Sequence, residues 1–186
     1  MTDQTWDKRY DQESDFSKEP SLFLKKQIHE LPRGMALDLA MGTGRNSIFL
    51  SKNGYVVDGI DSSGVAIEKV RSFAQRESLP INAKQADLTN YQIVENTYDV
   101  ILNFYFLERS LFPHIMKGLK QGGMLLFETY TIEQPKYGRP HNPAYLLKPN
   151  ELLQSFIDLH IIYYHERIDK QSGSIKAIAS LMAQKR

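Results

Sequence analysis

The chain contains no cysteine, and this absence rules out several kinds of chemistry at once. Disulfide bonds, thiolate metal sites and a cysteine nucleophile are all excluded. Histidine is also scarce, and its spacing does not follow a metal-ligand pattern; the five are His29, His114, His141, His160 and His165. We therefore predict that the protein holds no metal ion.

Long apolar runs and an excess of one charge are lacking as well. No stretch approaches the roughly 20 apolar residues that a membrane-spanning helix needs. The first residues, "MTDQTWDKRYDQESDF", do not have the basic and then apolar regions of a secretory leader. The formal net charge of +1 gives no electrostatic footprint for nucleic acid. We expect a cytoplasmic protein with no membrane or nucleic-acid partner.

What the chain does have is a regular alternation of apolar strands and amphipathic helices. Its 186 residues fit one domain with a sizeable core. Strands that alternate with helices form right-handed βαβ units, so we predict an α/β doubly wound, Rossmann-like parallel sheet with helices on both faces. After a helix that stops at Pro32, the predicted strands are 35–40, 55–61, 81–88, 98–106 and 124–131, and the predicted helices are 45–54, 62–77 and 109–123.

The last part of the chain departs from this alternation. A long polar loop at 132–150 leads to a short predicted helix at 151–156. Two strands, 159–168 and 175–184, then flank the linker "DKQSGS", whose glycine is typical of a connection between antiparallel neighbours. The sheet should therefore end in an antiparallel hairpin.

The stretch "LDLAMGTGRN", residues 37–46, ends an apolar strand in a carboxylate and small residues. Glycine is favoured where the backbone needs a positive φ or where another group approaches it closely. Asp38, Ala40, Gly42 and Gly44 follow one another too quickly for a regular element. We interpret this run as a binding turn.

Carboxylates at consecutive strand ends indicate what the turn binds. In open α/β sheets, ligands bind at the carboxyl ends of the strands. Asp61 follows the glycines at roughly the 20-residue distance at which an acidic side chain accepts the hydroxyls of a ribose. Asp87 lies where a carboxylate can accept from the exocyclic amine of adenine. Together they predict an adenosine-shaped site.

A dinucleotide is the first alternative for such a site. Its fingerprint needs a third glycine where this chain has Ser47, and its pyrophosphate disfavours the carboxylate of Asp38 inside the preceding strand. S-adenosylmethionine carries an amine, a ribose and an adenine but no phosphate, so it fits better. An NAD-dependent oxidoreductase stays as an alternative to a methyltransferase.

These motifs resemble those of class I S-adenosylmethionine-dependent methyltransferases, and more narrowly the tellurite-resistance (TehB-like) and thiopurine-type enzymes. The segment 37–61, with its Gly-Arg-Asn extension, carries most of the likeness, and "YDVILNFYFLE", "LKQGGMLLF" and "IASLMAQKR" match in kind. The resemblance implies a seven-stranded sheet in the order 3214576 with the last strand antiparallel. It also implies methyl transfer from S-adenosylmethionine to a small-molecule acceptor.

The resemblance further assigns roles in the cofactor site. The glycine turn would surround the methionine part, Asp61 would hold the ribose, Asp87 and Leu88 would flank the adenine, and Asn103 and Phe104 would close the site. "WDKRY" resembles an aromatic segment that folds over the cofactor, so residues 1–31 are predicted as a lid segment and helix. The predicted cofactor-binding set is Trp6, Arg9, Tyr10, Asp38, Ala40, Gly42, Gly44, Arg45, Asn46, Asp61, Ser62, Ala86, Asp87, Leu88, Asn103 and Phe104.

The acceptor is harder to predict, because the chain departs here from the pattern of the family. Tellurite-type enzymes carry a histidine and arginines near the last hairpin, whereas "IKAIAS" in the final strand has no arginine. We predict that the loop 132–148 forms a substrate wall, and that the acceptor is a thiol or a selenium or tellurium oxyanion. The candidate substrate residues are Tyr105, Tyr130, Arg139, His141, His165 and Arg167.

Two other functions share parts of this pattern. A non-catalytic module that binds S-adenosylmethionine would have the same cofactor residues, so it stays open. A methylase of nucleic-acid bases is disfavoured, because Asn103-Phe104-Tyr105-Phe106 lacks the prolines of the Asn-Pro-Pro-Tyr motif and the chain leaves no room for a recognition domain.

Overall fold

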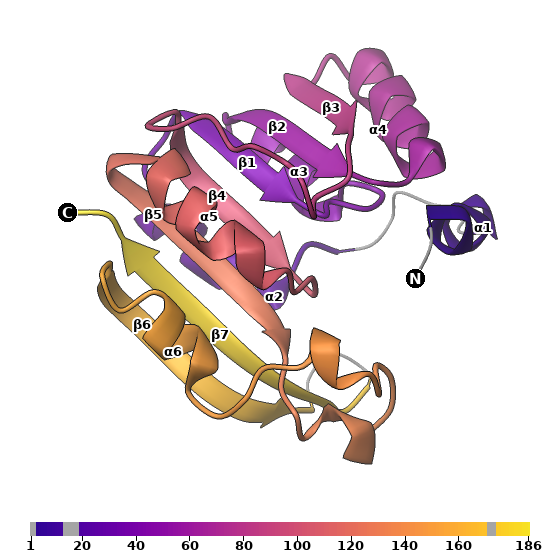
Figure 1. The fold of residues 1–186 in the computed structure, drawn as a ribbon. Helices are drawn as coiled ribbons and strands as arrows, with labels where there is room; N and C mark the ends of the chain where they lie inside the picture. Colours follow the sequence, from indigo (N-terminus) through magenta and orange to yellow (C-terminus); the bar gives the residue numbers. More distant parts are fainter. Residues whose placement is uncertain (1–2, 13–18, 171–173) are drawn as a thin grey trace.

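The sheet has the topology expected from the sequence. The computed structural model describes residues 3–12, 19–170 and 174–186, and its seven strands form one sheet in the order β3-β2-β1-β4-β5-β7-β6 (Figure 1). Neighbours from β3 to β5 are parallel, whereas β7 runs antiparallel to both β5 and β6. The strands are β1 (Met35–Leu39), β2 (Val56–Asp61), β3 (Ile81–Gln85), β4 (Tyr98–Phe104), β5 (Leu119–Tyr130), β6 (His160–Asp169) and β7 (Lys176–Gln184).

Helices cover both faces of the sheet, because successive side chains of a buried strand point to opposite faces. Leu37 and Leu39 of β1 point to one side and Ala36 to the other. α2 (Leu22–Gln27), η1 (Ile28–Glu30), α3 (Arg45–Lys52) and α4 (Gly64–Arg76) lie on the Ala36 side, and α5 (Phe112–Gly118) and α6 (Glu151–Ser155) lie on the opposite side (Figure 1). Because the helices cover both faces, a ligand can reach this sheet at the ends of its strands.

One predicted helix extended too far along the chain. The helix predicted at 109–123 is a short 3-10 turn, η2 (Arg109–Leu111), followed by α5, and β5 already begins at Leu119, which pairs with Tyr98 of β4. Gly122 has a φ of 80°, a conformation that a right-handed helix does not contain. The glycine pair in "KQGG" thus belongs to an irregular strand start and not to a helix end.

Two other predicted elements are shorter in the structure. The helix before Pro32 is divided into α2 and the single turn η1. The strand predicted to reach residue 88 stops at Gln85, because Asp87 accepts from the backbone N–H of Thr89 and starts a turn. The long loop contains two 3-10 turns, η3 (Gln134–Lys136) and η4 (Pro143–Tyr145).

The N-terminal helix α1 (Asp3–Gln12) lies outside the sheet. It sits beyond the arrowheads of β1 and β2 and beside α4 (Figure 1). The carboxyl ends of the parallel strands meet at this edge, where the glycine turn was predicted. No helix within the described ranges is long and apolar enough to cross a membrane.

Candidate functional site

The glycine turn between β1 and α3 adopts backbone conformations that explain its sequence. Gly42 and Gly44 have φ values of 54° and 77°, in the left-handed region that favours glycine. A Cβ on Gly42 would lie 2.8 Å from the Tyr10 hydroxyl, so the absence of a side chain also admits α1. Ala40 takes a φ of 53° as well, which is costly for a residue with a Cβ. The turn therefore has the positive φ values that its closely spaced glycines predicted.

Asp61, at the end of β2, ties this turn to the neighbouring strand. Its two carboxylate oxygens accept the backbone N–H groups of Gly42 at 2.8 Å and Ser63 at 2.9 Å. Burial raises the pKa of the Asp61 carboxyl, and these backbone bonds oppose the rise. Because each oxygen has a second lone pair, Asp61 can still accept a hydroxyl from a ligand.

Asp38, near the carboxyl end of β1, has an almost fully buried carboxylate. It accepts the hydroxyl of Ser47, on α3, at 2.6 Å. Burial raises the pKa of Asp38 to about 7, although the Ser47 bond and the charge of Arg45 lower it. A cation placed beside Asp38 would favour its ionised form, which is what the ammonium group of an amino acid does. In the sequence, Ser47 stood out only because it occupies the place of the third glycine of a dinucleotide-binding fingerprint.

The predicted adenine-binding residues follow β3. Asp87 is exposed, and one of its oxygens accepts both the backbone N–H of Thr89 at 2.9 Å and the Thr89 hydroxyl at 2.8 Å. These two bonds lower the pKa of the Asp87 carboxyl. Leu88 is buried and Ala86 is half-buried, and both pack in the core on the α5 side. Nearby, the carbonyl of Ser62 accepts from Gln85.

Three predicted cofactor residues have side chains engaged within the protein. The Asn46 side chain accepts the backbone N–H of Ser21 at 3.0 Å, and the Asn103 side chain donates to the carbonyl of Phe106 at 2.7 Å. Phe104 packs in the core beneath α2 and α3. These side chains hold the backbone around the site in place.

The α1 helix is fastened over the glycine turn. The Asp7 carboxylate accepts the Ser63 hydroxyl at 2.5 Å, and the ammonium of Lys69 donates to the carbonyl of Tyr10. The rings of Trp6 and Tyr10 stack with their centroids 5.7 Å apart. α1 therefore lies against the glycine turn, and that it covers a cofactor there stays a prediction. No pattern in the sequence pointed to Asp7. The side chain of Arg9, another predicted residue, lies outside the described part of the structure.

A second group of side chains lies at the ends of β4, β5 and β7, and its centre is Tyr105. The Tyr105 ring contacts that of Tyr130, with centroids 5.1 Å apart. The guanidinium of Arg45 and the ammonium of Lys176 lie 5.7 Å and 5.0 Å from the Tyr105 centroid. Tyr105 also has a φ of 57°, a strained conformation of the kind that clusters at functional sites. We call Arg45, Tyr105, Tyr130 and Lys176 the aromatic cluster.

Glu128, on β5, is buried beneath the aromatic cluster, with 3% of its surface exposed. One of its oxygens accepts the hydroxyl of Tyr105 at 3.0 Å and that of Ser21 at 3.4 Å. The other accepts the hydroxyl of Ser180 at 2.6 Å and pairs with Arg167 at 3.3 Å. Burial and the charge of Glu128 raise the pKa of the Tyr105 hydroxyl well above its usual value. This network joins five segments that are far apart in the sequence.

The predicted substrate residues divide into two groups. Tyr105 and Tyr130 belong to the aromatic cluster, and Arg167 reaches it through Glu128. His165, Arg139 and His141 are exposed, and the Nδ1 atom of His165 lies 3.4 Å from the hydroxyl of Tyr163. Sequence reasoning missed Glu128, Ser180 and Lys176. A search of "IKAIAS" for any cation, and not for arginine alone, would have found Lys176.

The predicted substrate loop is held at both of its ends. Near its start, the buried side chain of Gln134 accepts the backbone N–H of Ala177 at 2.8 Å and donates to the carbonyl of Arg139 at 3.0 Å. Near its end, Arg109 donates to the carbonyls of Ala144 at 2.9 Å and Leu146 at 3.1 Å. The loop therefore has a defined position beside β7.

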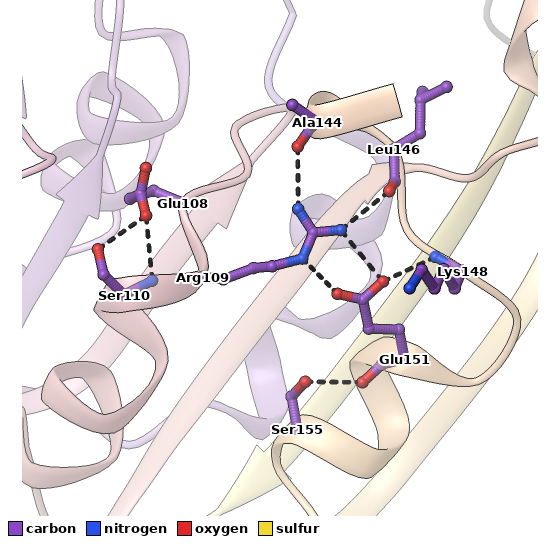
Figure 2. A network of polar contacts seen from close by, with 8 residues as sticks. All are labelled: Glu108, Arg109, Ser110, Ala144, Leu146, Lys148, Glu151 and Ser155. Carbon is purple, nitrogen blue, oxygen red and sulfur yellow. Dashed lines mark hydrogen bonds and ion pairs between the residues drawn. The ribbon is translucent and has the colours of Figure 1, made fainter. Parts of the chain in front are cut away.

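Figure 2 shows the polar contacts around Arg109. The guanidinium makes a two-pronged ion pair with Glu151 of α6, at 2.5 Å and 3.1 Å, while it also faces the two loop carbonyls. Glu151 in turn accepts the backbone N–H of Lys148 at 2.8 Å. Such bidentate pairs combine charge with fixed geometry. Arg109 thus connects the segment after β4 to the loop and to α6.

Known proteins resemble this chain over most of its length. The profile of a family described as "Tellurite resistance protein TehB" matches residues 5–175. A curated relative named Hemagglutinin 1, from Eikenella corrodens, is 32% identical over 155 residues, which make up 78% of this chain and 50% of that protein. The "Probable S-adenosyl-L-methionine-dependent methyltransferase TehB" of Haemophilus influenzae is 29% identical over 165 residues, 81% of this chain and 57% of the relative. The chain spans about half the length of these relatives.

Among solved structures, TehB from Haemophilus influenzae superposes on this fold with a TM-score of 0.78 at 21% sequence identity. The match covers 88% of this chain and 62% of that one. At this level of identity the likeness shows a shared fold, and it agrees with the sheet order and the antiparallel β7 described above.

Proposed function

This chain belongs to the TehB family, and from this premise we propose that it is an S-adenosylmethionine-dependent methyltransferase that acts on a small-molecule acceptor. The observation that carries the proposal is the meeting of the glycine turn with two buried carboxylates, Asp38 and Asp61, at one edge of the sheet. The relative from Haemophilus influenzae that is described as a probable methyltransferase aligns over this same region.

The residues at this edge fit the cofactor group by group. Asp61 has lone pairs for ribose hydroxyls, and its bond to Gly42 holds the turn open. Asp38 would favour the amino group of the methionine part, since a neighbouring ammonium stabilises a buried carboxylate. Arg45, at the start of α3, would face the methionine carboxylate. Asp87 and Leu88 would flank the adenine, and α1 with Trp6 and Tyr10 would cover the site.

For methyl transfer, the main task of the chain would be to position the cofactor and the acceptor. When bound, S-adenosylmethionine supplies a methyl group activated by a sulfonium. Holding two reactants in near-attack geometry can contribute roughly 7 to 11 kcal/mol of barrier lowering. The aromatic cluster and the loop 132–148 would orient the acceptor over the same strand ends, and a base is needed only for an acceptor that must lose a proton.

We infer further that the acceptor is soft, a thiol or a selenium or tellurium oxyanion, because such nucleophiles react when positioned beside positive charge. Residues 1–186 would act as one methyltransferase unit in the cytoplasm, with 1–31 as its lid and first helix. No nucleic-acid partner is proposed, since the net charge of +1 offers no polyanion site.

Calorimetric titration with S-adenosylhomocysteine, and with NADH as the comparison ligand, tests the cofactor. We expect micromolar binding of the first ligand and none of the second; the reverse result would favour an oxidoreductase. A screen of thiol, selenium, tellurium and aromatic acceptors for methylated products then tests turnover. Tight cofactor binding without any product would favour the non-catalytic binding module.

A further inference from the structure

Positively charged side chains gather around the ring of Tyr105 in the aromatic cluster. Arg45 and Lys176 belong to the cluster, and Arg167 lies beside it as a partner of Glu128. Glu128 accepts hydrogen bonds from four side chains, and Arg167 is the one of these that carries a charge.

Within the described ranges, neither Arg45 nor Lys176 forms an ion pair, and both lie against the ring of Tyr105. Carboxylates lie near both cations, since Asp38 feels the charge of Arg45 and Asp169 is the cross-strand neighbour of Lys176. Even so, two half-buried cations on one ring repel each other, so an anion placed beside them would be favoured.

Lys176 is the cation that the cofactor does not account for. It is the first residue of β7, a strand that contributes nothing to the glycine turn, whereas Arg45 directly follows Gly44 in that turn. Its side chain is half-buried. Burial and the charge of Arg45 lower the pKa of Lys176, and Asp169 and Glu128 oppose this effect. A bound anion would relieve both the burial and the repulsion.

We propose that Lys176 binds an anionic group of the methyl acceptor, and that this group is the carboxylate of an organic acid. Of the soft acceptors proposed above, this selects a thiol that carries a carboxylate over a selenium or tellurium oxyanion. This inference deepens the proposed function and rests on it. A mineral oxyanion would use the charge alone, whereas the paired rings of Tyr105 and Tyr130 offer a surface for an organic body beside that charge. The two cations on the Tyr105 ring thus serve two anions, the methionine carboxylate at Arg45 and the acceptor carboxylate at Lys176.

The surroundings of Tyr105 fit a preorganised binding surface. Its hydroxyl is held by Glu128, and Glu128 is fixed from the other side by Ser180 and Arg167, which themselves are 2.6 Å apart. A ring whose hydroxyl is already bonded loses little freedom when a ligand contacts its face. The network therefore supports the orientation of Tyr105 and leaves Lys176 to recognise charge.

The test is calorimetric titration of the protein saturated with S-adenosylhomocysteine, with three probes. 4-Hydroxybenzoate represents an organic acid, 4-hydroxybenzamide is its neutral analogue, and selenite represents a mineral oxyanion. The variants are Lys176→Met, which removes the charge at similar length, and Lys176→Arg, which keeps it. Lys52→Met is the matched control, because Lys52 also lies over a ring, that of Phe73 at 5.9 Å, but near the opposite edge of the sheet.

We expect wild type to bind the benzoate more tightly than the benzamide or selenite, and Lys176→Met to weaken benzoate binding about tenfold or more. Lys176→Arg and Lys52→Met should stay within about threefold of wild type, and all variants should bind S-adenosylhomocysteine equally. Equal benzoate binding by wild type and Lys176→Met would overturn the proposal, as would no preference for the anion, and a preference for selenite would overturn the organic acid. If wild type does not bind S-adenosylhomocysteine, the proposed function itself fails, and this result is distinct.

Discussion

The two halves of the candidate site are built in different ways. At the ends of β1 and β2, Asp61 binds backbone N–H groups of residues within 19 positions of itself. At the ends of β4, β5 and β7, Glu128 binds side chains up to 107 positions away. The first half is thus local and made largely by the backbone, and the second is assembled by the tertiary fold from distant side chains.

This difference indicates in which half of the site side chains can be replaced without disturbing the other half. Replacing a side chain in the aromatic cluster changes the charge and shape offered to an acceptor without altering the glycine turn, because the two halves share few residues. Arg45 touches both, since it follows the turn and lies against Tyr105, and Ser21 links them too, through Asn46 and Glu128. Such a division lets one cofactor site serve different acceptors.

The largest expected effect comes from removing the carboxylate that organises the first half. Asp61→Ala should weaken S-adenosylhomocysteine binding by about 1 to 3 kcal/mol, because it leaves the N–H groups of Gly42 and Ser63 without their acceptor and removes a ribose contact. Calorimetry measures the loss. Asp87→Ala, in which an exposed turn carboxylate is removed, should cost less; equal losses in the two variants would contradict the central place of Asp61.

A second prediction concerns the pH dependence of cofactor binding. If the ionised form of Asp38 holds an ammonium group, binding should weaken as pH falls below about 7, since protonation removes the charge. The dissociation constant of wild type should rise by up to about tenfold per pH unit there. Asp38→Asn should bind more weakly at pH 8 and show a flatter profile. The same slope in both proteins would remove Asp38 from the amine site.

The stability of the unliganded protein should respond in the opposite direction. The folded pKa of Asp38, about 7, lies above the ordinary value of 3.8, so folding favours its protonated form. Its contribution to stability is therefore fully present below pH 3.8 and is lost as pH rises through 7. Asp38→Asn should melt at a higher temperature than wild type at pH 8, with a smaller difference at pH 5. Scanning calorimetry at both values checks this sign.

Two glycine substitutions with smaller expected effects should separate the cost of backbone strain from the effect of contact with α1. Gly42→Ala and Gly122→Ala both place a Cβ at a positive φ, 54° and 80°, and each should lower the free energy of unfolding by about 1 to 2 kcal/mol. At Gly42 the Cβ would also meet the Tyr10 hydroxyl, whereas at Gly122 nothing lies within 4 Å. We expect the fluorescence of Trp6 to shift in Gly42→Ala alone. A shift in both variants would argue against the contact.

The sequence was most informative where structure is local. The alternation of strands and helices, the antiparallel hairpin at the end and the positive φ values of the glycine turn follow from patterns of a few residues, namely apolar runs and closely spaced glycines. The strand order was implied by the resemblance to methyltransferases and not by these patterns. The end of α5 was misplaced because a glycine pair reads equally well as a helix end and as an irregular strand start. Propensity alone does not separate those two structures.

The second half of the site could be predicted only in part. Tyr105 and Tyr130 were selected because aromatic side chains near the ends of two strands could line a pocket, but Glu128 and Lys176 have no local signal of function. Glu128 sits in an apolar strand, where a buried carboxylate needs partners, and those partners are brought by α2, β6 and β7. Arg139 and His141 were chosen for their chemistry in a loop that turns their side chains to solvent.

The smallest expected effect tests whether the loop is a fixed wall. Arg109→Met should cost about 1 kcal/mol or less in global stability, because the Arg109 side chain is 41% exposed and solvent screens its ion pair with Glu151. Its bonds to the carbonyls of Ala144 and Leu146 fix the loop, so amide exchange over 140–148 should quicken about fivefold while β5 stays protected. Arg71→Met is the matched control, since Arg71 also joins a carboxylate and a carbonyl, Glu68 at 2.7 Å and Ala83 at 3.0 Å, away from the loop. Faster exchange in both variants would mean that Arg109 has no special hold on the loop.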